Sequence, residues 1–492
     1  MAARIVVHGH FYQPPRENPW TGDIDQQPSA APFHDWNERV HAECYRPNVY
    51  ADLQTSKGEV IVNNFERMSF NVGPTLIAWL EKFHPQTYAR IVQADQKSIA
   101  RLGGGNAIAQ AYHHTILPLS DDRDVRTQVR WGLADFRHRF GREAEGMWLP
   151  ETACNDRILS VLIEEGVRFT ILAPHQAQRW RAEAGRWVSV TEGGIDTRLP
   201  YRYEHPDGSG RSLTLFFYDG GIARAIAFQN AMASAEGFLD MFIAGVDRDD
   251  HLIHAATDGE TYGHHHKFGE VGLAYALFVE ADKHDFEPTN YAAYLNETSP
   301  RLEAGVVGGL GSSWSCPHGV GRWKEDCGCS TGGDPEWNQA WRAPLRAALE
   351  ILKEKADDAY ERVSSDILED PWGGRDRYVD VVVGQKGLES FLSAEAIDPS
   401  SAVQAGRAGT LLEMQENAMA MFTSCGWFFN DLGGIETEQI LRYAARAMEL
   451  IESLGQPSGR ESVLAKLSEA KSNDPEVGTG IDVFNRALAA RP

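Results

Sequence analysis

The sequence Gly-Met-Trp-Leu-Pro-Glu at residues 146–151 decides the fold, together with a second stretch, His-Leu-Ile-His-Ala-Ala-Thr-Asp, at residues 251–258. Both are short and largely apolar, as buried parallel strands are, and each ends in one carboxylate, Glu151 or Asp258, before residues that start a turn or a helix. The carboxyl ends of parallel strands form the face on which loops gather and chemistry is done. We therefore expect the two acids to converge, as the carboxylate pair of a glycosidase does.

The same apolar signature recurs along the first 260 residues and predicts seven strands in all, at residues 5–10, 59–64, 107–113, 144–151, 168–173, 212–219 and 251–258. Helical patterns lie between several of them, for example at residues 72–83 and 156–165, the second with Asn155 as its N-cap. Strands that alternate with helices predict an α/β fold with a parallel sheet, and this many of them predict a barrel. Polar residues mark most of the strand ends: His8, His10, Asn63, Asn64, His113, His114, Glu151, Asp219 and Asp258.

The character of the sequence changes after about residue 300. A loop rich in Gly, Ser and Cys at residues 305–333 is followed by helical periodicity from Trp341 to Val363, by further helical stretches at residues 411–421 and 436–454, and by a possible short strand at residues 378–383. We expect two domains, a catalytic barrel at residues 1–335 and an α-helical domain at residues 336–492. The aromatic-rich turn at residues 425–431, which contains Trp427, is either a helix-packing contact or an aromatic platform over the barrel mouth.

The composition excludes several classes of partner. A formal net charge of −23 over 492 residues disfavours nucleic acid and anionic membranes, which require a basic face. The N-terminus lacks the pattern of a secretion signal, and no segment has the ~18 apolar residues of a membrane helix. Six unevenly spaced cysteines favour reduced thiols and a cytoplasmic location. The sequence gives no indication of oligomeric state.

Four motifs, in order, resemble those of glycoside hydrolase family 57. They are His-Gly-His-Phe-Tyr-Gln-Pro at residues 8–14, Gln-Ala-Tyr-His-His-Thr-Ile-Leu-Pro at residues 110–118, Trp-Leu-Pro-Glu at residues 148–151 and Asp-Gly-Glu-Thr-Tyr-Gly-His-His at residues 258–265. The resemblance implies an incomplete (β/α)₇ barrel followed by a helical domain. It also implies a retaining enzyme acting on α-glucans, with Glu151 as nucleophile and Asp258 as general acid/base.

The resemblance further implies that four residues line the subsite of the reacting sugar: His8, His10, Gln13 and His114. Five more candidates for substrate contact come from the motifs, a strand end and the aromatic loops: Trp148, Asp219, His264, Trp323 and Trp427. No cofactor is expected. The sequence departs from many family members at Gln110, where they carry a glutamate, and residues 16–20 resemble a branch with a domain of unknown function, DUF3536.

Two other functions remain open at this point. His8, His10 and the histidines at residues 264–266 offer imidazole ligands for a metal-dependent hydrolase or deacetylase, although three adjacent histidines cannot all face one ion. A barrel that binds glucan without catalysis is the third reading. Within the glycosidase reading, hydrolysis, 4-α-glucan transfer and branching are not distinguished by the sequence.

One loop carries a possible metal site of its own. Cys316, His318, Cys327 and Cys329 place three thiols and an imidazole within fourteen residues, and a Cys₃His set matches a closed tetrahedral zinc site. The single residue between the members of each pair is fewer than the usual two to four. The alternatives are a substrate-binding loop that uses His318, Arg322 and Trp323, and a loop with a purely structural role.

Overall fold

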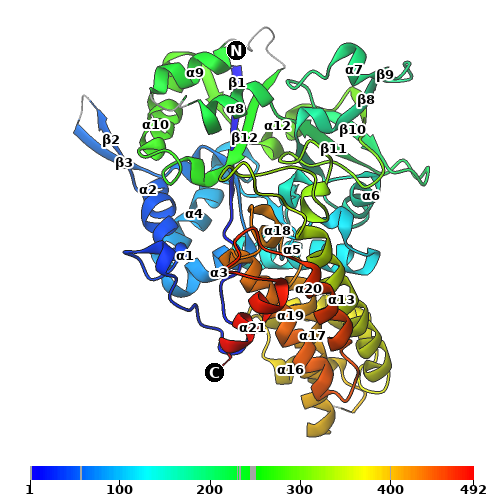
Figure 1. Cartoon of the computed structure of the whole chain (residues 1–492). Coiled ribbons are helices and arrows are strands. Elements are labelled where there is room, and N and C mark those ends of the chain that lie inside the picture. Colours follow the sequence, from blue (N-terminus) through cyan, green and yellow to red (C-terminus); the bar gives the residue numbers. More distant parts are fainter. Residues whose placement is uncertain are drawn as a thin grey trace. The chain divides into compact units, whose positions relative to one another are not determined.

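The computed structural model describes residues 3–55, 58–229, 231, 234–243, 251–398 and 400–491. The chain divides into two compact units. Unit 1 comprises residues 1–13, 26–110 and 139–314, and unit 2 comprises residues 14–25, 111–138 and 315–492. The fold class is α/β with a helical C-terminal part (Figure 1).

Every strand that the structure describes belongs to unit 1. In chain order the strands are β1 Ala3–Phe11, β2 Ala51–Thr55, β3 Gly58–Val62, β4 Ser69–Val72, β5 Ala109–Gln110, β6 Met147–Trp148, β7 Phe169–Leu172, β8 Ala177–Ala182, β9 Val188–Ser189, β10 Tyr201–Glu204, β11 Ser212–Phe217, β12 Leu252–Asp258, β13 Phe286–Pro288 and β14 Leu302–Val306. The helices of this unit are α1 Trp36–Val40, α2 Arg46–Val49, α3 Pro74–Phe83, α4 Pro85–Leu102, α6 Asp156–Glu164, α7 Val190–Gly193, α8 Gly220–Phe228, α9 Ala235–Ile243, α10 Gly269–Tyr275, α11 Ala281–Lys283 and α12 Tyr291–Glu297.

A series of parallel pairings positions the predicted site. β12 pairs with β1, and β1 pairs with β4, in parallel ladders. A parallel bridge joins β4 to Ala107, just before β5, and β5 pairs with β6. A second bridge joins Gly146, just before β6, to β7, and β7 pairs with β11. No described ladder or bridge joins β11 to β12. β1 and β12 are almost wholly buried along their length, as strands covered on both faces are.

Six of the seven predicted strand positions overlap strands of this series, and one prediction is wrong. The run Val60-Ile61-Val62 lies in β3, which forms an antiparallel hairpin with β2 and leaves Val60 and Ile61 exposed. The strand that pairs with β1 at this point of the chain is β4, which begins seven residues after the end of β3. An apolar run looks the same in sequence whether it lies in a solvent-facing hairpin or in a buried strand, because the sequence of one strand does not show which strand it pairs with.

A six-stranded sheet in the order β7-β11-β10-β14-β8-β9 extends the parallel pair β7 and β11 with antiparallel and parallel neighbours. β8 and β10 carry charged residues, among them Arg181 and Arg202, both of which bind Glu303 of β14. We did not predict these strands, since their alternation of apolar and charged residues is weaker than that of the buried series.

Unit 2 is helical where the structure describes it. Its helices are most of α5 Asp122–Phe140, then α13 Arg342–Ser364, α14 Pro371–Arg377, α15 Val379–Val382, α16 Leu388–Glu395, α17 Ala402–Ala420, α18 Cys425–Phe428, α19 Ile435–Ser453, α20 Arg460–Glu469 and α21 Gly480–Ala489. α13, α17 and α19 pack against one another, with α20 and α21 against α13 and α19 (Figure 1, yellow to red). In α13 the predicted apolar stripe, which includes Leu345, Leu349 and Leu352, is buried.

Two features of unit 2 differ from the sequence expectation. The possible strand at residues 378–383 is instead the short helix α15. The unit also includes residues 14–25 and 111–138, whereas we placed a single boundary at residue 335. Asp124 and Trp131 of α5 explain the second difference, because Asp124 binds Arg375 and the indole of Trp131 donates to the Arg375 carbonyl. Among the described residues, no helix is both long and apolar enough to span a membrane.

Candidate active site

The predicted residues on β1 are held by one amide. His8 Nε2 lies 3.2 Å from Asn71 Oδ1, and Asn71 Nδ2 lies 2.9 Å from His10 Nδ1. Asn71 is on β4, directly opposite His10 in the parallel ladder, and His10 lies opposite Asp258 on the other side. The strand register therefore brings a histidine of the first motif and the acid of the fourth motif side by side.

Trp148 completes an aromatic stack with these histidines. Its ring centroid is 4.9 Å from that of His8 and 5.1 Å from that of His10, with interplanar angles of 18° and 20°. Burial lowers the pKa of both His8 and His10 to about 3, with the neighbouring His10 lowering that of His8 further. Both imidazoles are therefore neutral at physiological pH. His8 also bonds to Ser69 Oγ, so both of its ring nitrogens contact protein.

Glu151 lies in a turn with unusual backbone geometry. In the 3₁₀ turn Pro150–Thr152, Glu151 has φ 55° and Thr152 has φ 49°, the left-handed region that side chains other than glycine rarely adopt. Gln176, which lies outside the turn, stabilises this backbone conformation by bonding to both the hydroxyl and the carbonyl of Thr152. Non-glycine residues held in this region cost on the order of 1–3 kcal/mol each and cluster at functional sites.

Trp314 binds Glu151 at two points. Its backbone N–H donates to the Glu151 carbonyl at 3.0 Å, and its indole Nε1–H donates to Glu151 Oε2, also at 3.0 Å. The indole packs edge-on against Trp148, with ring centroids 5.1 Å apart. The Glu151 carboxylate, 9% exposed, is thus fixed in direction by a donor that suits its charged form.

Asp258 ends β12, and its surroundings favour the protonated form, in contrast to those of Glu151. Although solvent reaches this residue, the protein around it disfavours the charged form, and the negative charges of Glu260 and Glu151 add to that effect. Together they raise the pKa of Asp258 to about 8. Asp258 therefore carries a proton at neutral pH, and Glu151 is near enough for its charge to contribute.

Glu260 is a third acid of the site, which we did not single out from the sequence. It is buried, and Tyr45 Oη donates to its Oε1 at 2.5 Å while the Tyr12 backbone N–H donates to the same atom at 3.2 Å. Burial raises the pKa of Glu260 to about 7, and the bonds from Tyr45, Tyr12 and Gln13 oppose the rise. The predicted Gln13 therefore lies at this acid.

Two buried donors of the site have no acceptor among the described residues: Gln110 Nε2 and Trp148 Nε1. Gln110 Oε1 accepts from Asn71 Nδ2 at 2.7 Å, which directs the amide's free N–H₂ away from Asn71. A buried donor without a partner is costly, typically 1–3 kcal/mol. Such donors suit a site whose ligand supplies oxygen acceptors.

The remaining predicted residues of unit 1 have local protein partners. Asp219 caps α8, since its Oδ1 accepts from the backbone N–H groups of Gly221 and Ile222. His264 pairs with Glu43, whose pKa is lowered by bonds from His264 and Arg39 against the opposing effect of burial. These contacts account for both side chains without a substrate.

Three predicted residues belong to unit 2. His114 bonds through Nδ1 to Ser424 Oγ at 2.7 Å and is 1% exposed. Trp323 and Trp427 are each 0% exposed, and the Trp427 indole donates to the Arg342 carbonyl. Trp427 is therefore a packing residue of unit 2, in agreement with the first of its two predicted roles.

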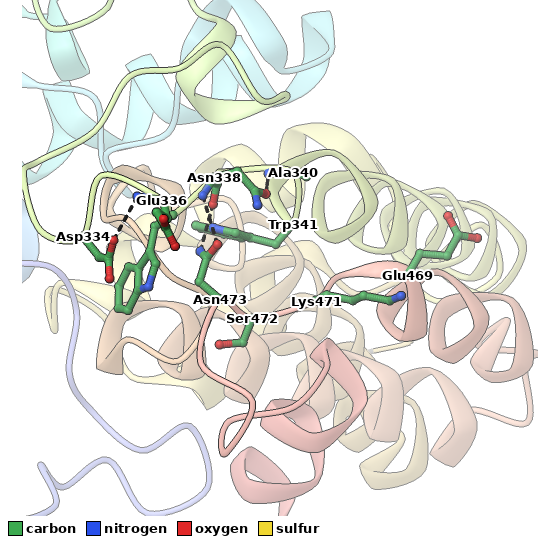
Figure 2. A pocket seen from close by; sticks show the side chains of 10 residues that line it. Asp334, Glu336, Asn338, Ala340, Trp341, Glu469, Lys471, Ser472 and Asn473 are labelled. Atoms are coloured by element: carbon green, nitrogen blue, oxygen red, sulfur yellow. Dashed lines mark hydrogen bonds between the residues drawn. The ribbon is translucent and has the colours of Figure 1, made fainter.

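Unit 2 also has a surface pocket of about 690 Å³ (Figure 2). Asn473 holds one wall, with its amide donating to the Asn338 carbonyl at 2.8 Å and accepting from the Asn338 N–H at 3.0 Å. The Glu336 N–H donates to Asp334. These contacts engage much of its polar lining, and none of the predicted site residues lines it.

Metal-ligating side chains gather in two places among the described residues: Cys316, His318, Cys327 and Cys329, and Glu38, His41 and His84. Neither group includes His8, His10 or the histidines at residues 264–266. Among the residues that the structure describes, the histidines that would serve a metal-dependent hydrolase do not form a metal centre.

Two family models together match nearly the whole chain. The sequence model of glycosyl hydrolase family 57 matches residues 11–303, and that of DUF3536, a domain of unknown function, matches residues 337–491. An α-amylase from Pyrococcus horikoshii is 22% identical over 238 residues, which are 44% of this chain and 35% of that protein. The chain spans about a third or less of the length of the curated relatives it matches.

Solved structures show the same fold. An exo-type maltose-forming amylase from Pyrococcus sp. ST04 superimposes with a TM-score of 0.72 at 14% identity, covering 95% of this chain and 83% of that one. A 4-α-glucanotransferase from Thermococcus litoralis gives a TM-score of 0.55 at 14% identity, covering 92% of this chain and 60% of that one. At these identities the likeness concerns the fold.

Proposed function

Because the chain belongs to glycosyl hydrolase family 57, we propose that it is a retaining enzyme that cleaves α-glucans by double displacement and transfers the glycosyl group to water or to another sugar. The observation that carries the proposal is the pair of acids with opposite tendencies. Asp258 holds a proton because its pKa is raised to about 8, while Glu151 receives the Trp314 indole donor that favours a carboxylate. The relatives named α-amylase and 4-α-glucanotransferase support the choice of substrate class.

The first displacement uses both acids. Glu151 attacks the anomeric carbon while the bond between that carbon and the glycosidic oxygen breaks. Asp258 gives its proton to the glycosidic oxygen, so the leaving sugar departs as a neutral alcohol. The product of this step is a glycosyl ester of Glu151. Glu260 assists by keeping Asp258 protonated until the leaving oxygen arrives, since its charge disfavours the Asp258 carboxylate.

The second displacement reverses the roles. Asp258, now a carboxylate, takes a proton from water or from an acceptor hydroxyl, whose oxygen attacks the anomeric carbon and releases Glu151. The unpartnered donors Gln110 Nε2 and Trp148 Nε1 are suited to sugar hydroxyl oxygens in both steps. A glutamate at position 110 would supply acceptors there instead, so Gln110 is the family departure with the clearest chemical consequence.

We also infer that the seven parallel strands form an incomplete (β/α)₇ barrel, in the order β12-β1-β4-β5-β6-β7-β11. This inference is supported by the parallel ladders and bridges along the series and by the likeness to the maltose-forming amylase. The described strands leave β11 and β12 without a ladder between them. Both acids then stand at the carboxyl ends of strands, where barrel enzymes place their chemistry.

The decisive experiment compares the wild type with Glu151→Gln, Asp258→Asn and a control, Glu66→Gln, on maltooligosaccharides and amylose. Glu66 pairs with Lys97 and serves as the control because it is not among the acids of the site. We expect no detectable turnover in Glu151→Gln, a loss of about 10²–10⁴-fold in Asp258→Asn and no change in Glu66→Gln. Azide should restore turnover of Glu151→Ala and give a glycosyl azide of inverted configuration.

Product analysis of the wild type separates the three chemistries: glucose release for hydrolysis, a disproportionation ladder for transfer and new α-1,6 linkages for branching. Full activity in either carboxylate variant contradicts the mechanism. A wild type that binds maltooligosaccharides without any of these products is the non-catalytic glucan-binding protein instead. Activity that is lost with a chelator while the protein stays folded, and is regained with metal, favours the metal-dependent hydrolase.

A further inference from the structure

Four ligand atoms in unit 2 surround a common point. Cys316 Sγ lies 3.9 Å from Cys327 Sγ and 3.6 Å from Cys329 Sγ, and Cys329 Sγ lies 3.5 Å from His318 Nδ1. All four atoms are within 4.8 Å of one another. The residues come from the two ends of a short loop between Trp314 and α13, so the loop closes on itself at this point.

These separations are the edges of a zinc tetrahedron. With Zn–S of about 2.3 Å and Zn–N of about 2.0–2.1 Å, tetrahedral angles place sulfurs about 3.8 Å apart and sulfur and nitrogen about 3.6 Å apart. A disulfide would require about 2.05 Å between two sulfurs, and Cys316, Cys327 and Cys329 form none. We propose that Cys316, His318, Cys327 and Cys329 bind one zinc ion in a closed Cys₃His site.

The backbone of the loop fits a wrap around an ion. Gly319 and Gly328, next to His318 and between the last two cysteines, both have φ 78°, which glycine adopts without steric cost. The short spacing that is unusual for zinc ligands is thus accommodated by a left-handed residue beside each pair. Cys316 and Cys329 are buried and His318 is exposed, so the ion would lie just beneath the surface of unit 2.

A second, independent observation concerns charge. Arg342 and Arg322 are 0% and 6% exposed, and neither forms an ion pair with a carboxylate of the described residues. Arg342 Nη1 instead donates to the Cys329 carbonyl at 3.1 Å, and the Nε of each arginine lacks an acceptor there.

Zinc resolves this charge imbalance. An ion of charge +2 held by three thiolates and a neutral imidazole carries a net charge of −1, which attracts both guanidinium groups. Three protonated thiols would carry no charge, so neither buried guanidinium would gain this attraction, and burying a cation without an ion pair is costly in a protein interior. The arginines therefore suit the metal-bound loop and not a loop of free thiols.

The closed ligand set assigns the ion a structural role. Four protein ligands leave no position for water or substrate, unlike catalytic zinc sites, which have three. The ion would fasten the 3₁₀ turn Gly321–Trp323, whose Trp323 is fully buried and whose Arg322 lies over the ring of Phe428 in α18, 4.3 Å from its centroid. Because Trp323 presents no face to solvent, the alternative of a substrate-binding loop is disfavoured.

The test is metal analysis of the full chain, purified without a polyhistidine tag from zinc-supplemented cells. We expect close to one zinc per chain in the wild type and almost none in Cys327→Ser. Cys425→Ser is the matched control, since Cys425 is in the same unit but outside the cluster, and should keep the zinc. Wild-type protein with only trace metal overturns the proposal.

A second measurement guards against a variant that fails to fold. Cobalt substituted into the wild type should give the intense thiolate-to-cobalt charge-transfer and visible d–d absorption of a tetrahedral site, and titration with zinc should bleach both. His318→Cys provides four thiolates and should retain the metal with a shifted spectrum. Weak octahedral absorption in the wild type contradicts the site, whatever the fate of Cys327→Ser.

Discussion

Asp258 and Glu260 are separated by one glycine, and the negative charge of Glu260 raises the pKa of Asp258. Loss of hydration next to the surrounding protein is the largest cause of the raised pKa of both, at about 8 for Asp258 and about 7 for Glu260, and Glu260 makes the larger of the two charge contributions at Asp258. The two acids therefore titrate as a coupled pair with Glu151 nearby. Such an arrangement keeps a general acid protonated at neutral pH.

The pH dependence of kcat/KM should report this coupling. Since Asp258 acts in its protonated form, activity is present below its pKa and is lost as the pH rises through about 8. Glu260→Gln removes a negative charge that raises the pKa of Asp258, so the alkaline limb should move to lower pH. The measurement is a pH profile of wild type, Glu260→Gln and the Glu66→Gln control; an unmoved or upward-shifted limb in Glu260→Gln would refute the coupling.

The sequence predicted the site residues that lie in recognisable local motifs, but not those whose role depends on contacts with residues far away in the sequence. Glu151 and Asp258 follow apolar strands, and the motifs include His8, His10 and Trp148. Trp314 has no such signal, because its partner Glu151 lies 163 residues away and no pattern around it predicts the contact. Asn71 was missed for the same reason, since its bonds to His8 and His10 depend on the pairing of β1 with β4.

At the scale of elements, the turn that carries Glu151 depends on a segment from another part of unit 1. Cys154 and Ser312 form an antiparallel bridge, and Trp314, two residues on, holds both the carbonyl and the carboxylate of Glu151. Asn155, predicted as an N-cap, does cap α6 directly after this turn, accepting from the Ile158 N–H. The turn is therefore fixed on one side by a helix start and on the other by the segment 312–314.

Trp314→Phe tests that arrangement, since it retains an aromatic ring and removes the indole donor to Glu151. A hydrogen bond to a charged group is worth about 1.5–3 kcal/mol, so kcat/KM should fall by roughly 10- to 100-fold. Trp180→Phe is the matched control in the same unit, because it removes an indole bond to the Gly194 carbonyl. Equal activity in both variants would show that the Trp314 donor does not orient Glu151.

Across the whole molecule, the chain enters unit 2 three times, and this explains why no single boundary describes it. Periodicity places α13 and α19 close to their observed positions and predicts only the second half of α17, but it contains no information on which unit the earlier segments join. Asp124 of α5 illustrates the point: it is buried between Arg375 and Lys353, and these cations lower its pKa against the opposing effect of burial. Both partners lie beyond residue 335.

A fragment of residues 1–335 should therefore not fold by itself. It would leave the Asp124 charge without its partners, at a cost of about 3–5 kcal/mol for a broken buried pair, and would expose Trp131, which is 0% exposed in the chain. We expect an insoluble or protease-sensitive product, rescued when residues 336–492 are co-expressed. Monodisperse protein with cooperative unfolding from residues 1–335 alone would establish the boundary that the sequence suggested.

The threading of residues 14–25 into unit 2 has a consequence for synthesis on the ribosome. Trp20 Nε1 donates to Glu449 at 2.8 Å, across 429 residues, and Asn18 Nδ2 donates to the Ala490 carbonyl at 2.9 Å. At a translation rate of about 5–20 residues per second, Trp20 waits roughly 20–90 s for its partner. The segment that follows the first strand thus emerges among the earliest residues and is among the last to reach its native contacts, so a chaperone has that interval in which to act.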